Sequence, residues 1–414
     1  MTPDEPLRPN HPLAIRMAVI SFFVHNLVIG CIFGSYGVLM LAVEARTHMT
    51  RELSSLGISL VLAVIALMAP VFGVLVGKFS LRLLMMLGAL MMSGGFVILA
   101  IGGGAYSYLA VYALLFGPAM SLNSTMLPLT LVTRWYNVNR GRALGIVTMP
   151  LLATGMAPMV ALVLRNCGLS ATYFMLAGLS ATLLLAAWFV IDHPPSSAQS
   201  ASKVPFRETA AGPGISVGQL LYSSRFWTLS LAFAAVSTSA TILAAHLVPL
   251  TMGWGIDAIS AASLMSFSSI GGMIGSAVLG WGADRLGGAL TLVILCLGGA
   301  ILWSLMLLQP PYPVTAILVG LIGFMGAPIV AVASMAFSQL LGRASFGRAL
   351  GMCYLVGLPF LVLGVPAAAH VYVRTGSYAG ALIGVVALLL VGAACALLSQ
   401  VAKLMSKSRA LKAA

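Results

Sequence analysis

The sequence contains two related halves about 207 residues apart. The segment Gly73–Lys78, of pattern Gly-x-x-x-Gly-Lys, recurs as Gly280–Arg285, of pattern Gly-x-x-x-Asp-Arg, an offset of 280 − 73 = 207. The segment Gly141–Gly145 (Gly-Arg-Ala-Leu-Gly) recurs unchanged as Gly347–Gly351, an offset of 347 − 141 = 206. Both copies lie between long apolar runs. The repeat therefore predicts two helical bundles that arose by duplication, as in one class of membrane folds.

The chain is too apolar for a soluble domain. Hydrophobic residues make up 60% of it, charged residues only 7%, and the mean hydropathy is +1.07. About a quarter of the residues in soluble domains are charged, so we expect the apolar surface to be buried in lipid. The polar residues 1–13 precede an apolar run that is too long for a secretory signal, so the first span is expected to be retained. The five cysteines lack paired spacing and predict no disulfide framework, metal site or cofactor.

Twelve apolar runs have the length of about 20 residues that a bilayer span requires. They are residues 14–42, 54–77, 83–104, 107–133, 142–164, 171–191, 226–252, 258–282, 288–308, 313–341, 348–372 and 377–402. The sequence therefore predicts an all-α membrane protein with two parallel six-helix repeats. The expected domains are an N-terminal bundle (1–191), a linker rich in proline, serine and glycine (192–225) and a C-terminal bundle (226–414).

The placement of basic residues predicts the orientation of the chain. Of the 21 lysines and arginines, only Arg46, Arg51, Arg165 and Arg374 lie on the side opposite the N-terminus, which leaves 21 − 4 = 17 on the N-terminal side. By the positive-inside rule, both termini and the linker are cytoplasmic in a multi-pass protein of the bacterial inner (plasma) membrane. The net charge of +13 is thus explained by topology. A nucleic-acid partner is not expected.

The loop after the second span of each half resembles the signature loop of the major facilitator superfamily, and the resemblance covers nearly the whole chain. It implies the major facilitator fold and a cytoplasmic gate that this loop holds closed. The first copy departs from the family pattern, because Gly77 stands where the family has aspartate. We therefore expect an asymmetric gate carried mainly by Asp284 and Arg285. The basic residues expected to assist are Lys78, Arg142 and Arg348. The alternative is that all of these residues are turn formers and topology determinants.

A narrower resemblance is to the monocarboxylate and oxalate/formate transporter branch. It rests on Trp135-Tyr136, the segment Arg140–Ile146 and the segment His246–Leu250. The resemblance implies a small organic acid as substrate. That branch has a Gly-Arg pair in the eighth span that binds the substrate carboxylate, but this chain has Gly275-Ser276 there. The missing guanidinium disfavours a dicarboxylate such as oxalate, because no bidentate grip on the anion is available.

Polar residues within spans are candidates for substrate contact. In the superfamily, the first, fourth, seventh and tenth spans line the cavity, and here they and the eighth span carry His25, Tyr36, Asn123, Thr238, Thr241, His246, Ser269, Ser276 and Ser334. His25 lies about 16 Å into its span at 1.5 Å per residue. We expect His25, in one stripe with Ile29, Ile32 and Tyr36, to face the cavity and Asn26 to lie in a packing seam. The alternative for each residue is a structural hydrogen bond between helices or, for serine, to its own helix.

These observations together predict a secondary active transporter rather than an enzyme. The substrate is a small organic solute, expected to be a monocarboxylate with or without a coupled proton, moved by alternating access. Titration of His25 or His246 would supply the proton coupling. A proton-coupled efflux pump and, less favoured, a transporter-fold nutrient sensor are the alternatives. The expected partners are the solute, the lipid bilayer and in the coupled case a proton, and the functional unit is expected to be a monomer.

Overall fold

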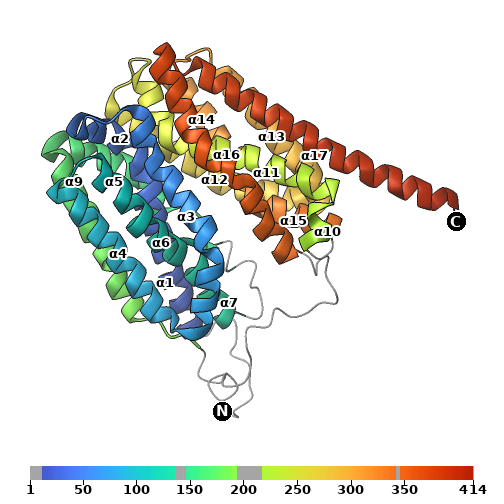
Figure 1. Ribbon diagram of the computed structural model, residues 1–414, viewed down its shortest axis with the longest axis horizontal. Coiled ribbons are helices and arrows are strands. Elements are labelled where there is room, and N and C mark those ends of the chain that lie inside the picture. The colour runs from blue at the N-terminus through green and yellow to red at the C-terminus, as the bar shows by residue number, and fades with distance from the viewer. Residues whose placement is uncertain (1–11, 137–142, 144–145, 194–216, 342–345, 414) are drawn as a thin grey trace, which may run out of the picture. The chain divides into compact units, whose positions relative to one another are not determined.

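The computed structural model describes residues 12–136, 143, 146–193, 217–341 and 346–413 (Figure 1). Within these residues the regular secondary structure is helical and contains no strand. The chain divides into two compact units, Met1–Glu208 and Thr209–Ala414. The predicted linker 192–225 falls largely on residues 194–216, which lie outside the described residues, and the predicted domain limits stay a prediction.

The first unit is built from helices joined by short turns. Its elements are α1 (Pro12–Ile29), the π-helix η1 (Gly30–Gly34), α2 (Ser35–Thr47), α3 (Arg51–Lys78), α4 (Leu81–Ile101), α5 (Ala105–Val111), the π-helix η2 (Tyr112–Phe116), α6 (Gly117–Met120), the π-helix η3 (Ser121–Met126), α7 (Leu127–Trp135), the 3-10 helix η4 (Leu152–Gly155) and α9 (Met156–Trp188). The hydroxyls of Thr50 and Ser80 accept backbone N–H groups and so cap α3 and α4. Helix α4 packs along α9.

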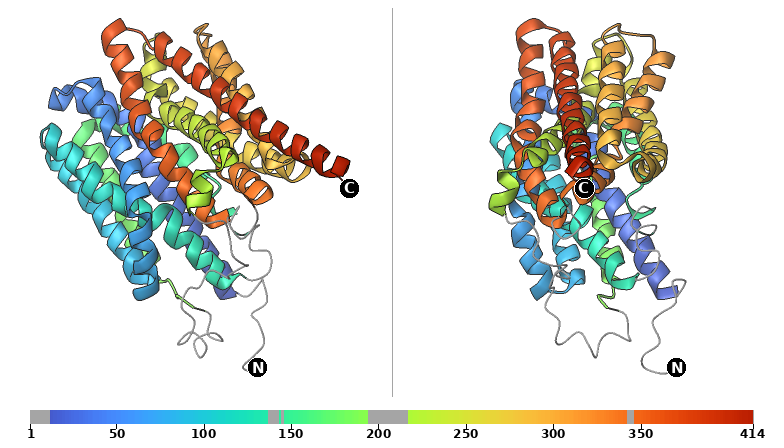
Figure 2. Two further views of the ribbon diagram at one scale, coloured as in Figure 1. Left: turned by 45° about the vertical axis from the view of Figure 1, so that its right-hand side comes forward. Right: turned by 90° about the vertical axis from the view of Figure 1, so that its right-hand side faces the viewer.

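The second unit has longer uninterrupted helices. They are α10 (Val217–Leu221), α11 (Ser224–Met252), α12 (Ala258–Leu286), α13 (Gly288–Met306), α14 (Tyr312–Gly326), α15 (Ile329–Leu341), α16 (Phe346–Thr375) and α17 (Ala379–Ala413). Helix α11 is the most deeply buried and packs against both α16 and α17, while α17 also packs along α13 (Figure 2). The core of this unit therefore surrounds α11.

The two units repeat the same helix spacing. Helices α3 and α12 begin at residues 51 and 258, α4 and α13 at residues 81 and 288, and α5 and α14 at residues 105 and 312. Each pair differs by 207 residues, the offset found between the sequence motifs. The predicted all-helical membrane fold with two repeats is confirmed.

Eleven segments in the described residues are long and apolar enough to cross a membrane, against twelve predicted spans. The difference arises because α9 contains the fifth and sixth spans, which turn at Gly168 with φ 80° and ψ 178°. Only glycine adopts that backbone conformation readily. The prediction of one continuous fifth span at 142–164 is wrong, because Thr148–Leu151 is not helical and η4 follows it.

One further expectation is corrected by the structure. The stripe that placed His25 and Tyr36 on one face assumes a regular helix, but η1 lies between them and its wider π turn breaks the 3.6-residue periodicity. Elsewhere in the first unit, Glu44 lies within α2 and forms an ion pair of 3.2 Å with Arg51. The ion pair lets this carboxylate sit at a largely buried position.

Helices α12 and α14 approach each other with their backbones in contact. A Cβ atom added to Gly271 would lie 1.8 Å from the carbonyl oxygen of Gly320, and one added to Gly275 would lie 2.0 Å from that of Phe324. Any side chain at either position would therefore separate the helices. Gly275 therefore has a structural role in helix packing. This role does not depend on whether an arginine follows the glycine, as it does in the monocarboxylate and oxalate/formate branch.

Candidate functional site

His25 contacts a backbone carbonyl of the fourth span. Its Nδ1 atom contacts the carbonyl oxygen of Ser124 in η3, and the side chain is 8% exposed. In a regular helix that carbonyl would accept from the N–H of residue 128, but Pro128 has none. Because a carbonyl only accepts, Nδ1 of His25 carries the proton and donates it. In the neutral ring Nε2 is then the atom that takes up a second proton.

Asn26 holds the interrupted fifth span. Its side chain is fully buried, and its Nδ2 atom donates to the carbonyl of Val147 at 3.3 Å while its Oδ1 atom accepts from the N–H of Leu152 at 3.2 Å. Nδ2 also lies 3.0 Å from the carbonyl of Phe22, one turn earlier in α1. One amide side chain thus satisfies a backbone group on each side of the break. Within the break, the hydroxyl of Thr154 donates to the carbonyl of Pro150 at 2.9 Å.

Tyr36 and Asn123 are buried between helices of the first unit. The Tyr36 hydroxyl donates to the carbonyl of Ser54 at 2.6 Å and accepts from the N–H of Ile58 at 3.2 Å, which ties α2 to α3. Asn123 donates from Nδ2 to the carbonyl of Met85 in α4 at 3.1 Å, whereas its buried Oδ1 has no partner among the described residues. Both side chains therefore connect neighbouring helices of their own unit.

His246 has both ring nitrogens engaged. Its Nε2 atom lies 2.9 Å from the carbonyl of Val365 in α16 and must donate, and its Nδ1 atom lies 3.2 Å from the hydroxyl of Tyr378 and accepts. These bonds fix the Nε2–H tautomer and connect α11 to the last two spans. Protonation of Nδ1 would turn the acceptor of the Tyr378 hydroxyl into a donor.

Three of the remaining hydroxyl candidates bond to their own helix, and Thr238 and Ser276 are not among them. Thr241, Ser269 and Ser334 donate to the carbonyl oxygens of Ser237, Met265 and Val330, four residues earlier in their own helices, at 2.9, 3.1 and 2.6 Å. Thr238 packs against α16, where a Cβ atom on Gly364 would lie 2.5 Å from its methyl group, and its buried hydroxyl has no partner among the described residues. Ser276 is half-buried on α12.

The predicted gate residues are only partly described. Lys78 is the exposed last residue of α3, and the guanidinium of Arg285 stacks over the ring of Trp281 at 4.0 Å. Asp284 and Arg348 lie in α12 and α16, but their side chains are outside the described part, as is the whole of Arg142. The asymmetric gate stays a prediction.

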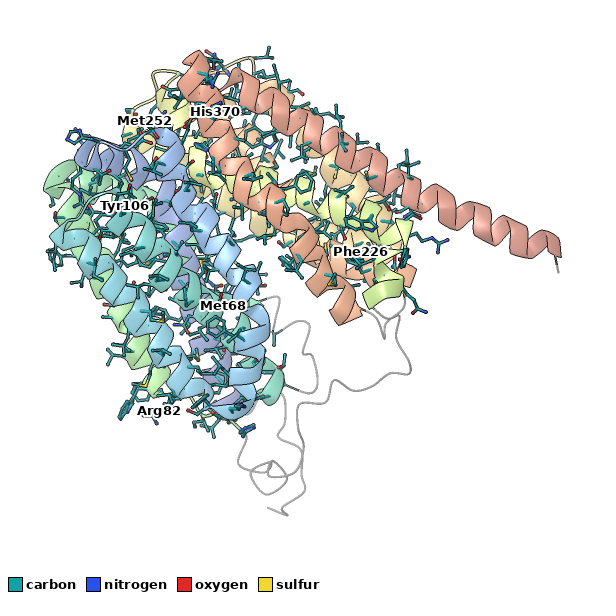
Figure 3. The ribbon with its side chains drawn as sticks, in the orientation of Figure 1. Met68, Arg82, Tyr106, Phe226, Met252 and His370 are labelled. Atoms are coloured by element: carbon teal, nitrogen blue, oxygen red, sulfur yellow. The ribbon has the colours of Figure 1, made fainter. Side chains whose placement is uncertain are left out.

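A carboxylate that the sequence analysis did not single out caps the helix after the first signature loop. Asp192 accepts from the N–H groups of Leu81 and Arg82 at 2.8 and 3.3 Å, at the end of the unit where Figure 3 labels Arg82. A carboxylate is favourable at a helix N-terminus. In the second unit the equivalent N–H, of Gly288, donates to Oε1 of Gln339 at 3.0 Å. The two signature loops are therefore anchored by different side chains.

His193 and Arg134 meet beside this cap. A guanidinium nitrogen of Arg134 lies 3.3 Å from Nε2 of His193 and another lies 3.5 Å from the carbonyl of Val76. Burial and then the nearby Arg134 charge lower the pKa of His193, although Asp192 opposes the shift. The ends of the second, fourth and sixth spans thus form one polar cluster.

Two signals in the sequence point to contacts that the pattern analysis missed. Pro128 lies at the start of α7 and Pro150 lies in the break of the fifth span, and neither has the N–H that a regular helix would use. His25 and Asn26 are the polar residues of the first span that contact backbone groups near these prolines. Both residues point into their own unit, one toward the fourth span and one toward the fifth.

Comparisons with known proteins place these contacts in a transporter fold. The family model described as Major Facilitator Superfamily matches residues 19–356. The chain is 24% identical over 257 residues to the uncharacterized MFS-type transporter YcxA of Bacillus subtilis (strain 168), a match spanning 61% of this chain and 62% of that relative. It is also similar to a crystal structure of the nucleoside transporter NupG, with a TM-score of 0.73 and 14% identity over 94% of this chain and 99% of that one. That likeness shows the fold alone.

Proposed function

The chain belongs to the major facilitator superfamily and is a transporter of that type, and on this premise we propose that it moves a small organic solute together with a proton bound by His25. The observation that supports the proposal is the contact between His25 Nδ1 and the carbonyl of Ser124. This contact orients the ring and leaves Nε2 as the protonation site. Movement of the solute is by alternating access.

The charge inventory of the spans favours co-transport with a proton. No span carries a lysine or arginine near its middle in the sequence, so a bound anion would find no fixed positive charge there. Burial of an uncompensated carboxylate is costly. A weak organic acid that enters with a proton adds no net charge to the site, which keeps a monocarboxylate within the proposal.

His25 is a better proton site than His246. The Nδ1 atom of His246 already accepts from Tyr378, and Nε2 donates to Val365, so protonation requires the Tyr378 hydroxyl to turn away. Protonation of His25 at Nε2 leaves its bond to Ser124 intact, because Nδ1 stays a donor. Protonation therefore breaks a hydrogen bond at His246 but none at His25.

Proteoliposomes with an imposed pH gradient test this proposal with a set of candidate acids, nucleosides and sugars as radiolabelled solutes. His25→Asn keeps a donor near the Nδ1 position but cannot titrate. We expect this variant to lose at least tenfold in gradient-driven uptake while solute exchange at equal pH changes less than threefold. His246→Gln, which keeps the donor to Val365, serves as the matched control and should retain its response to the gradient.

Gradient-driven uptake that survives in His25→Asn would refute the role of His25. Wild-type uptake that ignores the pH gradient would refute proton coupling altogether. In that case an uncharged polar solute becomes the favoured substrate. The absence of lysine and arginine from the middle of the spans fits such a solute, and the similar solved structure is that of a nucleoside transporter.

A further inference from the structure

The break in the fifth span lies at membrane depth. Residues 148–155 begin six positions after Arg142 and end ten positions before Arg165, the basic residues that flank this span. The break ends thirteen residues before the turn at Gly168, which is about 20 Å at 1.5 Å per helical residue. The hydrocarbon core is about 30 Å thick. The irregular backbone is therefore inside the apolar region.

The shared fold does not require this break. The equivalent residues of the second repeat, 355–362 at the offset of 207, lie inside the continuous helix α16, although Pro359 is among them. The contact between the first and fifth spans also differs between the two repeats. The first unit uses the buried amide of Asn26, whereas the second unit places Phe233 against Tyr354. The interruption is thus a property of one repeat only.

One face of the break is hydrogen-bonded to Asn26, and the other face is exposed. Asn26 satisfies Val147 and Leu152 from within the unit. On the other side Leu151 is 53% exposed, and Thr148 and Gly155 are exposed as well. Non-helical backbone at membrane depth is tolerated where protein buries it or where it lines a water-filled cavity, and not where it faces lipid. Exposure at this break therefore indicates contact with water.

We propose that residues 148–155 of the fifth span line the aqueous path of the transported solute, with Asn26 as the residue that positions them. This inference rests on the proposed transport function and assigns part of its solute site. Discontinuous spans supply backbone donors and acceptors for substrates in other transporters. The segment carries hydroxyl and peptide groups but no charge. It suits an uncharged or weakly acidic organic solute that forms hydrogen bonds.

Reactivity of engineered cysteines tests the inference without any transport measurement. The five native cysteines are replaced by alanine, and single cysteines are introduced by Leu151→Cys in the break and Leu90→Cys in the middle of the regular helix α4. The two leucines are 53% and 56% exposed, so they are matched in accessibility. The probe is a negatively charged, membrane-impermeant methanethiosulfonate, applied to protein in lipid nanodiscs with both faces open.

We expect Leu151→Cys to react at least fivefold faster than Leu90→Cys, because the thiolate forms only in water. Gly155→Cys provides a second position, since no atom lies within 4 Å of a Cβ atom built there. It should react as fast as Leu151→Cys to within threefold. A ratio below fivefold between Leu151→Cys and Leu90→Cys would place the break against lipid and overturn the inference.

The labelling experiment and the transport experiment can refute their two proposals separately. Slow labelling at Leu151→Cys with intact pH-driven uptake would refute the assignment of the fifth span and leave the proposed function standing. Fast labelling in a protein whose uptake ignores the pH gradient would support the aqueous path and refute proton coupling. Protection of Leu151→Cys by a solute that the wild type transports would identify the segment as part of the binding site.

Discussion

Phe233 and Tyr354 pack edge to face in the second unit, with ring centroids 5.0 Å apart and ring planes inclined by 77°. At the offset of 207 residues, the same positions of the first unit are Asn26 and Val147, which share a hydrogen bond of 3.3 Å. The contact between the first and fifth spans of each repeat is thus apolar in one unit and polar in the other. The two repeats therefore share a contact at equivalent positions, but it is a hydrogen bond in the first unit and an aromatic contact in the second.

Asn26→Leu should destabilise the first unit. The substitution keeps the number and branching of the side-chain heavy atoms but leaves the buried carbonyl of Val147 and the N–H of Leu152 without their partner. An unsatisfied buried group costs about 1–3 kcal/mol. Thermal unfolding of the purified protein in detergent should show a lower midpoint.

Ser180→Ala is the matched control for that variant. Ser180 is also fully buried in the first unit, but its hydroxyl donates to the carbonyl of Leu176 in its own helix and otherwise meets the thiol of Cys31, a weak hydrogen-bonding group. Loss of such a bond should change the midpoint little. Equal midpoints for Asn26→Leu and Ser180→Ala would show that the break does not depend on Asn26.

Gly275→Ala should disrupt the second unit. The added Cβ atom would lie 2.0 Å from the carbonyl oxygen of Phe324, so α12 and α14 would have to move apart. Overpacking of this kind costs about 1–3 kcal/mol or more. Gly280→Ala in the same helix meets no atom within 4 Å and should be neutral or stabilising. Size-exclusion profiles and unfolding midpoints of the two variants compare them directly, and a normal Gly275→Ala protein would contradict the close backbone contact.

Asp192→Ala should loosen the start of α4. Two N–H groups, those of Leu81 and Arg82, lose the carboxylate that accepts from them. Removal of a helix cap costs about 0.5–2 kcal/mol. Hydrogen exchange measured by mass spectrometry should accelerate in the peptide that covers residues 79–84. The peptide at the start of α13, where Gln339 accepts from Gly288, is the internal control and should not change.

His193 should make the first unit more stable at neutral than at mildly acidic pH. Its pKa is lowered from 6.5 in the folded protein by burial and by Arg134. The folded state therefore binds this proton less readily than the unfolded state does. The stabilisation is complete above pH 6.5 and is lost as the pH falls through and below that value. Unfolding midpoints at pH 7.5 and 5.5 should differ less in His193→Gln than in the wild type, and an unchanged difference would exclude His193 as its source.

The helices and their repeat follow directly from local sequence properties. The apolar runs predicted the membrane spans, since only a helix satisfies its own backbone in lipid. The offset between Gly73–Lys78 and Gly280–Arg285 predicted helix starts that the structure places 207 residues apart. The fifth span failed as a prediction, because Pro150 is compatible with both a kinked and a broken helix. Only the neighbouring Asn26 decides between them.

The contacts of the candidate site residues were harder to predict from the sequence than the helices were. The role of His25 in the cavity stays a prediction, and its observed partner, the carbonyl of Ser124, lies about 100 residues away in the sequence. The stripe through His25 and Tyr36 failed because the π-helix Gly30–Gly34 changes the helical register between them. A π turn has no reliable sequence signature. Periodicity therefore cannot be carried across one.

The amino-acid order alone determined that this chain is a duplicated, all-helical membrane protein, because apolar length, basic flanks and repeated motifs are local properties. Tertiary packing decided which polar side chains serve the backbone and which residues they meet. Asn26 and Phe233 occupy equivalent positions, yet one bridges a broken span and the other packs on an aromatic ring. A buried polar group is stable only with a partner, and that partner is supplied by a helix far away in the sequence.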